Sequence, residues 1–505
     1  MMKKILFAVL LALSCLPLAA QDVYVATDKG CYLAGENIGC SAFCAKGPSV
    51  VLLELVSSDG VAAMGKLAVA GGRGAGVLRI PFGTPTGNYR LRACLPGGAP
   101  AGGPVISVFN TLSTDRVKDG VEVVGSLSSA PKALETGYGF SVEQAGDSLV
   151  IRNLSGAAAS VCLSLYREDS LQPVMRSSIA GFKQPAPSEP SDGEVIRGRI
   201  TGPDASAATG VILAVPGSAT DCYRAEVQED GTFSVRTENI FGDVDIVCIP
   251  SGLGEGRTAH AELEQVFSTS PEPGLPKLEI CRSMEADLLR RTAAMQEQQL
   301  TDTLTSSLPV HAGHFFLEHE CTRYVLDDYT RFPTMEEVFV EIIPQVRMRR
   351  KGGKPSITLL IPSSVSDGMP RWGDAVVMVD GVPVLDHSLI ESYDPAIIKT
   401  IDVYPYRYYL GPSDFDGVVN LVTFDGRMPG LLLPDNIRIY GFHGCSLPQA
   451  FRGSETLFWH PLAEIPAGGN VSVPCAGVDP GVFYTLSVEG ISADGVPLYL
   501  RKTFF

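Results

Sequence analysis

The densest group of side chains that could bind a metal lies past the middle of the chain. Three histidines, two glutamates and a cysteine fall close together: His311, His314, Glu318, His319, Glu320 and Cys321. Imidazole, carboxylate and thiolate are the ligands that zinc prefers in proteins. A catalytic zinc helix would carry His-Glu-x-x-His, but Glu320 is followed by Cys321, Thr322 and Arg323. No His-x-x-Glu pair occurs in the sequence either. Two interpretations follow: a metal-dependent hydrolase, or a polar strand or loop entering the next domain, which we favour.

Other catalytic patterns are missing from the sequence. No Gly-x-Ser-x-Gly occurs, so no serine is raised on a strand-to-helix turn. The glycine-rich run at 71–76 lacks the Lys-Ser/Thr of a phosphate loop and lies between predicted strands. We therefore expect no catalytic residues, no bound cofactor and no enzymatic activity.

A basic cluster stands out in an acidic chain. It consists of Arg347, Arg349, Arg350, Lys351 and Lys354, around a Gly-Gly pair at 352–353. One interpretation is a solvated hairpin over 346–359 whose alternating arginines face outward. The other is a docking patch, because a local positive field would attract anionic lipid headgroups or an acidic partner, more weakly at high salt.

The start of the chain has the features of a secretory signal. Residues 1–20 contain Lys3 and Lys4, a short apolar core over 5–13, and a small-residue cleavage site at 18–20. Cleavage would remove two of the 40 basic residues and none of the 56 acidic ones, so the net charge would change from −16 to −18. Such a surface repels nucleic acid, which we exclude as a partner.

Lipidation at Cys15 is the alternative processing event, although residues 12–14 match the usual lipoprotein pattern poorly. Signal cleavage would leave 11 of the 12 cysteines, so at least one would be unpaired within a monomer. No later apolar run reaches the ~20 residues of a membrane-spanning helix. We expect an exported protein, periplasmic or associated with the outer membrane, without a transmembrane span in the mature chain.

The elements that must position these residues are mostly strands. Short apolar runs are separated by many of the 53 glycines and 36 prolines, as stacked sandwiches require. The predicted fold is mainly β, with tandem β-sandwich domains, one helical linker and a small α/β domain. The predicted order is signal peptide 1–20, β-sandwich 21–112, second β-sandwich 113–183, linker 184–193, third β-sandwich 194–268, helical linker 269–323, α/β domain 324–426 and C-terminal β-sandwich 427–505.

The one clear helix is predicted over 280–304. Ile280, Met284 and Leu288 are spaced by four residues, and Ser283 is the expected N-cap. We expect this helix to bridge two β regions.

Two of the predicted sandwiches resemble known domain families. The pattern Tyr24-x-x-Thr27-Asp28-Lys29-x-x-Tyr32-x-x-Gly35-Glu36, closing with Gly87-x-Tyr89-x-Leu91, resembles macroglobulin-like domains. A protease trap of that family would need a Cys-x-x-Gln thioester, which is absent, and this leaves protease inhibition without a thioester as an alternative function. The segment 194–268, with its Asp230-Gly231 turn and Phe233 anchor, resembles carboxypeptidase-regulatory-like domains, which are usually scaffolding.

Four stretches of the segment 324–426 carry a recognisable pattern, at 326–338, 376–383, 395–403 and 411–421. The motif positions are Asp380, Gly381, Pro383, Asp402, Gly411, Phe415, Asp416 and Gly417. Taken in order, these stretches resemble the plug domain of TonB-dependent outer-membrane receptors. The pattern indicates a buried strand over 375–379, a turn at 380–381, a short helix around 395–399, and strands at 401–404 and 418–422.

Only 79 residues follow position 426, far fewer than the barrel of a receptor needs. The resemblance therefore implies an envelope binding or scaffold protein that does not transport by itself. Its plug-like domain would contact an outer-membrane or other envelope protein. The sequence leaves the identity of that partner and the oligomeric state open.

Overall fold

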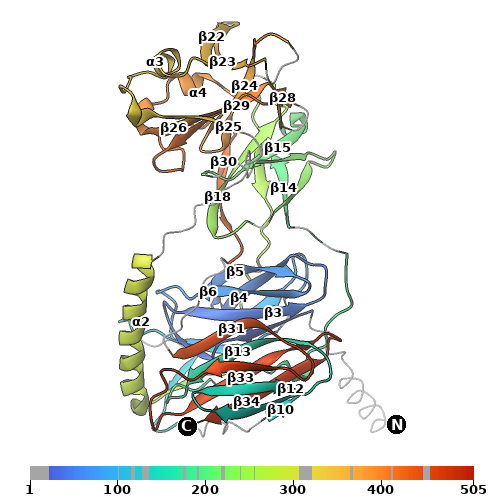
Figure 1. The fold of residues 1–505 in the computed structure, drawn as a ribbon, viewed down its shortest axis with the longest axis vertical. Helices are drawn as coiled ribbons and strands as arrows, with labels where there is room; N and C mark the ends of the chain where they lie inside the picture. Colours follow the sequence, from blue (N-terminus) through green and yellow to red (C-terminus); the bar gives the residue numbers. More distant parts are fainter. Residues whose placement is uncertain are drawn as a thin grey trace, which may run out of the picture. The chain divides into compact units, whose positions relative to one another are not determined.

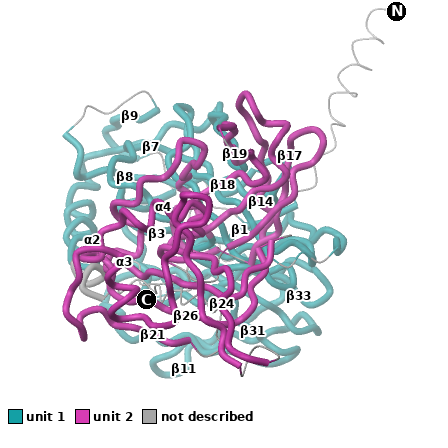
Figure 2. The backbone as a smooth tube through the Cα atoms, turned by 90° about the horizontal axis from the view of Figure 1, so that it is seen from above, with its two compact units in different colours: residues 1–193, 266–306, 445–505 teal, residues 194–265, 307–444 magenta. Residues whose placement is uncertain are grey.

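A computed structural model describes residues 22–100, 102–114, 120–127, 136–173, 178–189, 191, 193–217, 222–238, 240–254, 256–305, 321–363, 368–410, 413–446 and 455–504. The chain divides into two compact units (Figure 2). Unit 1 comprises residues 1–193, 266–306 and 445–505, and unit 2 comprises residues 194–265 and 307–444. The predicted fold class is confirmed, because the described residues form several sandwich-like sheets and few helices.

Unit 1 begins with an eight-stranded sandwich. Its strand order is β1 (Val23–Thr27), β3 (Asn37–Cys44), β6 (Arg73–Arg79), β5 (Gly60–Ala70), β4 (Val50–Ser57), β7 (Gly87–Cys94), β8 (Val105–Phe109) and β2 (Cys31–Leu33). The long strand β5 pairs with both β4 and β6 and so joins the two halves of the sandwich. Ile38, Leu53, Leu67 and Leu91 are buried in the core between these halves.

The second sandwich of unit 1 is built from two distant parts of the chain, and we call it the composite sandwich. One sheet has the order β10 (Thr136–Tyr138), β34 (Pro497–Phe504), β33 (Tyr484–Ser492), β13 (Ala159–Arg167) and β31 (Thr456–Ile465). The other has β11 (Phe140–Ala145), β12 (Ser148–Asn153) and β32 (Asn470–Pro474). The core between them contains Leu149, Leu163, Ile465 and Leu486.

The prediction of separate sandwiches over 113–183 and 427–505 is therefore wrong. Strand β13 is buried along most of its length and needs a neighbour on each side. Both neighbours, β31 and β33, come from the C-terminal segment. Neither segment holds enough strands to cover its own apolar face, so the two share one core.

The predicted helix is α2 (Glu285–Thr305), which packs within unit 1 (Figure 1). It starts later than predicted because the strand β20 (Leu278–Ile280) and the 3₁₀ turn η4 (Arg282–Met284) occupy the first positions. Ser283 lies inside that turn and is not the N-cap. Met284 and Met295 bury their side chains against Leu33 and Phe109 of the first sandwich. β20 pairs in parallel with β9 (Val121–Val123), and η2 (Ile179–Gly181) completes the unit.

Unit 2 contains a two-sheet sandwich. One sheet has β17 (Thr232–Thr237), β14 (Glu194–Thr201) and β19 (His260–Leu263), and the other has β16 (Cys222–Glu226), β15 (Gly210–Ala214), β18 (Asp243–Ser251) and β30 (Arg438–His443). A short turn, η3 (Ala205–Ala207), precedes β15. Phe233 lies in the core, as predicted. β30 was predicted in the C-terminal sandwich, but it extends this sheet by pairing with β18.

The rest of unit 2 is an α/β module. Its sheet runs β21 (Thr322–Val325), β26 (Ile398–Tyr404), β29 (Gly417–Thr423), β24 (Arg371–Val379), β23 (Lys354–Ile361) and β22 (Val346–Lys351), with β25 (Val382–Val384) also paired to β24. A small hairpin joins β27 (Tyr408–Leu410) and β28 (Ser413–Phe415). The helical elements are η5 (Leu326–Asp328), α3 (Met335–Glu341), α4 (Ser388–Glu391) and η6 (Pro395–Ile397). Strands β24 and β29 pair in parallel, whereas the other pairs are antiparallel.

The sandwich and the α/β module of unit 2 share buried strands. Ile212 of β15 and Val247 of β18 belong to the core of the α/β module. Their neighbours Leu213 and Cys248 point to the opposite side, into the core of the sandwich. Strands β15 and β18 are thus buried on both faces, and the two parts of unit 2 form one hydrophobic body.

Candidate functional site

The histidines of the predicted metal cluster lie outside the described residues. This applies to His311, His314 and His319 and to the two glutamates beside them. Cys321 is described and is half-buried at the start of the α/β module. Within the described part of the chain, no group of three or more His, Cys, Asp or Glu side chains is placed to hold a metal ion. None of the helices in that part combines the length and apolar character needed to cross a membrane.

The basic cluster forms a β-hairpin, as the sequence predicted. Strands β22 and β23 pair antiparallel, with Lys351 opposite Lys354 at the tip. Gly352 and Gly353 make the turn with φ angles of 61° and 85°, and positive φ at both positions is typical of a type I′ turn. We call residues 346–361 the basic hairpin.

The two faces of the basic hairpin differ in polarity. Val346 and Ile357 are fully buried in the core of the α/β module. Because side chains alternate along a strand, Arg347, Arg349 and Lys351 lie together on the opposite, open face. All three are exposed, so this face presents positive charge to solvent.

Neighbouring side chains orient several of these cations. The Arg347 guanidinium lies 3.9 Å from the centre of the Trp372 ring. Arg350 is 2.6 Å from a carboxylate oxygen of Glu391, and Lys351 Nζ is 3.8 Å from a carboxylate oxygen of Asp374. These ion pairs are solvent-exposed and contribute only about 0–1 kcal/mol each. The cations therefore remain available to another molecule.

One histidine, His387, is hydrogen-bonded to the backbone of the hairpin. The backbone N–H of Ile357 in β23 donates to Nδ1 of His387 at 3.0 Å. Burial lowers the pKa of His387, which favours the neutral ring that can accept this hydrogen bond. The next carboxylate, Asp386, accepts from the backbone N–H and the hydroxyl of Ser388 at 3.0 and 2.7 Å, and the hydrogen bond from that hydroxyl lowers the pKa of Asp386.

The predicted turn at Asp380 and Gly381 is buried and hydrogen-bonded to neighbouring segments. Asp380 is 2% exposed and has a φ of 49°, unusual for a residue other than glycine. Its carboxylate accepts hydrogen bonds from the backbone N–H and hydroxyl of Thr423, both at 2.7 Å, and from the N–H of Met428 at 2.8 Å. The N–H of Gly381 donates to Asn420 Oδ1 at 3.1 Å. This turn ties β24 to β29 and to the chain that follows.

The remaining plug-like motif positions also hold the module together. Asp402 is buried and accepts two hydrogen bonds from Arg323 on the paired strand β21, at 2.7 and 2.8 Å. Asp416 accepts from Arg371 at 3.0 Å, and this contact lowers the pKa of Asp416. Gly417 has no room for a Cβ atom next to Leu359 and the carbonyl of Tyr404.

Three motif positions complete the comparison with the sequence prediction. Pro383 is buried in β25 opposite Met378, and Phe415 packs at the margin of the core. Gly411 lies outside the described residues. The structure thus places Asp380 and Gly381 in one turn, bonded to β29 and to Met428, but places Asp402 and Asp416 in separate contacts.

Sequence reasoning missed a buried polar contact between the two sandwiches of unit 1. The Asp28 carboxyl accepts from the Tyr32 hydroxyl at 2.7 Å, the N–H of Gly39 at 2.8 Å and the Thr456 hydroxyl at 2.7 Å. Asp28 is completely buried, and this burial raises the pKa of its carboxyl. Asp28 and Tyr32 stood in the quoted pattern, but nothing in that pattern indicated Thr456 as their partner.

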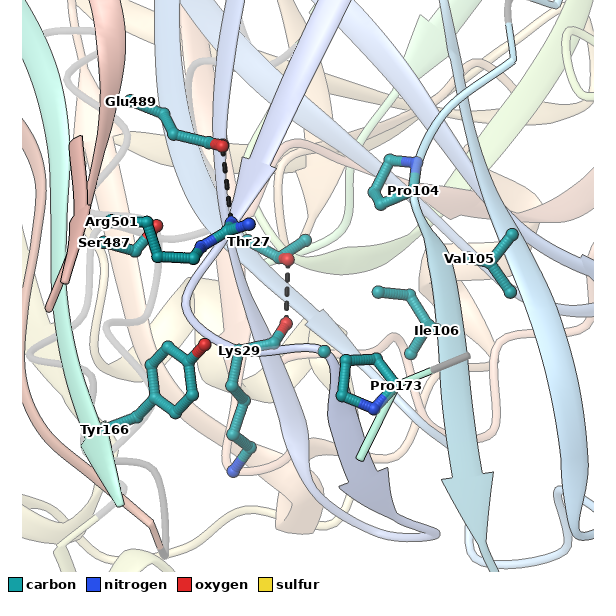
Figure 3. A pocket seen from close by; sticks show the side chains of 11 residues that line it. Thr27, Lys29, Pro104, Val105, Ile106, Tyr166, Pro173, Ser487, Glu489 and Arg501 are labelled. Atoms are coloured by element: carbon teal, nitrogen blue, oxygen red, sulfur yellow. Dashed lines mark hydrogen bonds and ion pairs between the residues drawn. The ribbon is translucent and has the colours of Figure 1, made fainter. Parts of the chain in front are cut away.

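A second polar contact joins the same sandwiches. The Tyr24 hydroxyl donates to a carboxylate oxygen of Glu489 at 2.8 Å, and burial raises the pKa of Glu489. Figure 3 shows Glu489 next to Arg501, whose guanidinium is 3.5 Å away, at the margin of a small cavity. The cavity measures about 30 Å³ and is lined in part by Lys29 and Tyr166. It has room for one or two water molecules, so we regard it as part of the packing and not as a ligand site.

No known protein family matches this sequence, and no curated protein matches it either. A Salmonella alpha-2-macroglobulin reacted with methylamine is similar with a TM-score of 0.24 and 10% identity, over 96% of this chain and 39% of that one. The native conformation of E. coli alpha-2-macroglobulin gives a TM-score of 0.17 and 9% identity, over 96% of this chain and 22% of that one.

A third similar structure is SGBP-B of the Bacteroides ovatus mixed-linkage glucan utilization locus, in complex with a mixed-linkage heptasaccharide. Its TM-score is 0.12 at 11% identity, over 44% of this chain and 68% of that one. The chain spans 22% and 39% of the two macroglobulins, well under two thirds of their length. At these TM-scores, none of the three similarities carries an argument about function.

Proposed function

We propose that this chain is an exported, non-catalytic binding or scaffold protein of a Gram-negative cell envelope, whose basic hairpin contacts an acidic partner protein at the outer membrane. The observation that carries the proposal is the concentration of five cations on one hairpin of a chain with a net charge of −16. A local field of opposite sign steers and orients an acidic partner.

The construction of unit 2 supports presentation of this surface. The hairpin strands continue into the core that the α/β module shares with β15 and β18. The hairpin is therefore mounted on a packed body and does not need to be ordered when a partner binds, which lowers the entropic cost of association.

The sequence resemblances supply the cellular setting of the proposal. A macroglobulin-like and a carboxypeptidase-regulatory-like domain would space a plug-like domain. A plug-like domain in this setting suits contact with another envelope protein. The secretory signal predicted over 1–20 places this contact outside the cytoplasm.

The proposal is tested by quantitative affinity capture from solubilised envelope fractions. We expect the wild-type chain to retain an outer-membrane protein whose recovery falls with rising salt and with the double change Arg347→Glu and Arg349→Glu. Lys399→Glu is the matched control, because Lys399 is an exposed cation on β26 of the same sheet. Equal recovery by all three proteins, or no membrane protein recovered by any of them, would contradict the proposal.

A further inference from the structure

The basic hairpin ends in a strand edge whose backbone groups have no partner strand. β22 is the last strand of its sheet among the described residues. The N–H of Leu360 donates to the carbonyl of Gln345 at 2.8 Å, which fixes the phase of the ladder. Bonded and non-bonded pairs alternate in an antiparallel ladder, so the N–H and C=O groups of Met348 and Arg350 point away from β23.

Proline at position 355 agrees with this phase. Pro355 lies opposite Arg350, and it has no N–H to donate. At a non-bonded pair, proline removes no hydrogen bond between β22 and β23. One outward-facing N–H, that of Val346, is already bonded to the carbonyl of Ile343 at 3.0 Å. The open part of the edge therefore begins at Met348.

The side chains beside this open edge select for negative charge. An antiparallel strand added to β22 would lie about 4.8 Å away and would bond through Met348 and Arg350. Its residues opposite Arg347 and Arg349 would form non-bonded pairs, in which cross-strand side chains approach most closely. Acidic residues at every second position would then meet these two arginines on the open face.

The same cations argue against other occupants of the edge. A second copy of β22 would place arginine against arginine, and like charges directly opposite are destabilising. A lipid headgroup could meet the arginines but could not bond in register to the backbone groups of Met348 and Arg350. Cations on an edge strand also disfavour pairing with uncharged strands. An acidic strand is the kind that these cations favour.

We infer that β22 binds an extended acidic segment of a partner protein as an additional antiparallel strand. This inference rests on the proposed function and specifies the chemistry of the partner. The segment alternates acidic residues, which face the arginines, with uncharged residues, whose backbone N–H and C=O groups bond to Met348 and Arg350.

The test uses fluorescence polarisation with the full mature chain and a labelled peptide that alternates glutamate and threonine. A second peptide is N-methylated on its threonine amides, which would face β22. A third is N-methylated on its glutamate amides, which would face solvent, and serves as the matched control. All three peptides carry the same charge, so they separate backbone pairing from charge attraction.

We expect threonine methylation to weaken binding by about tenfold or more, because it removes backbone hydrogen bonds, and glutamate methylation to leave binding nearly unchanged. Arg347→Glu with Arg349→Glu should abolish binding, whereas Lys399→Glu should not. Equal binding of the two methylated peptides would overturn strand addition but leave a charge-based docking function intact.

Two further outcomes would also overturn the inference. One is binding of the chain to vesicles of phosphatidylcholine and phosphatidylglycerol together with no binding to any peptide, which would assign the edge to lipid. The other is the absence of peptide binding while the affinity capture still depends on Arg347 and Arg349, which would keep the proposed function and reject this mode of contact.

Discussion

A single hydrogen bond links the hairpin to His387, a buried histidine. His387 accepts from the backbone N–H of Ile357, and only the neutral ring can accept. The charged groups that act on the ring are Asp386 and Asp374. Lys354 acts in turn on Asp386, and Lys351 Nζ lies 3.8 Å from a carboxylate oxygen of Asp374. Burial outweighs the two carboxylates and lowers the pKa of His387 in the folded protein.

The sign of the pH dependence follows from this lowered pKa. Histidine in the unfolded chain takes up its proton at about pH 6.5, whereas folded His387 does so only at lower pH. Below pH ~6.5 the unfolded state therefore binds more protons, and the contribution of His387 to stability falls as the pH falls. The contribution is fully present above pH ~6.5.

We predict that β23 loses hydrogen-exchange protection on going from about pH 7.5 to about pH 5.5, beyond the change in intrinsic exchange rate. His387→Asn is the matched control, because its side-chain oxygen can accept from Ile357 and does not titrate. The readout is the peptide covering residues 354–361, compared between the two proteins at each pH. Identical protection in both proteins at the lower pH would refute the prediction. Asp28 and Glu489, whose pKa values are raised, act in the opposite direction and are common to both proteins.

Among the elements, α2 is held to unit 1 by buried charge as well as by apolar contacts. Arg291 is 3% exposed and makes two hydrogen bonds to Asp169 at 2.7 and 2.8 Å. It also donates to the carbonyl of Cys31 in β2 at 3.1 Å. Arg290 lies 2.8 Å from the same Asp169 and 2.7 Å from Glu455. The helix therefore connects the first sandwich to the composite sandwich.

We predict that Arg291→Ala destabilises unit 1 by about 2 to 3 kcal/mol, less than the ~3–5 kcal/mol of a fully broken buried pair because Arg290 still neutralises Asp169. Chemical denaturation followed by circular dichroism gives the change in the free energy of unfolding. Hydrogen exchange in residues 285–299 should increase in parallel. Arg282→Ala, at an exposed position in the preceding turn, should change neither quantity, and an effect as small for Arg291→Ala would argue against this role.

Local sequence signals predicted most elements of the α/β module, but the helix expected around 395–399 is the shorter turn η6, and position 398 already belongs to β26. The Gly-Gly pair between alternating basic and apolar residues indicated the hairpin, and the Asp380-Gly381 turn followed a continuous apolar run. The start of α2 was predicted too early, because its 3.6-residue spacing extends into a strand and a 3₁₀ turn. The spacing of apolar residues does not tell where a helix begins.

Such local signals could not predict which distant strands pair with one another. β13 is buried along most of its length, but its sequence does not indicate that both neighbouring strands lie some three hundred residues later. The bond between Asp28 and Thr456 spans 428 positions and was missed for the same reason. The basic hairpin was predicted because its residues are contiguous, whereas the contact between the sandwiches was not.

At the scale of the whole molecule, the composite sandwich depends on two distant parts of the chain, residues 136–167 and 456–504. We predict that two separately encoded fragments, residues 21–450 and 451–505, copurify when both are coexpressed without the predicted signal, so that they share one compartment. The second fragment supplies β31 and β33 on either side of β13, and burial of their apolar faces drives the association.

The matched control places Leu486→Asp in the second fragment, because this side chain is completely buried in the shared core. A charge there should abolish copurification. If the altered fragment associates as well as the wild type, or if the wild-type fragments do not associate, the dependence of β13 on the C-terminal strands is refuted.

The position of β13 between β31 and β33 also sets the order of folding in a chain that is synthesised from its N-terminus. The first sandwich has all its strands once residue 109 has emerged. Unit 2 has all its strands once residue 443 has emerged. The composite sandwich has all its strands only when residue 504 has emerged. It therefore begins before unit 2 and is completed after it. During that interval the apolar faces of β12 and β13 are not buried by the C-terminal strands. A holding chaperone would bind these exposed faces.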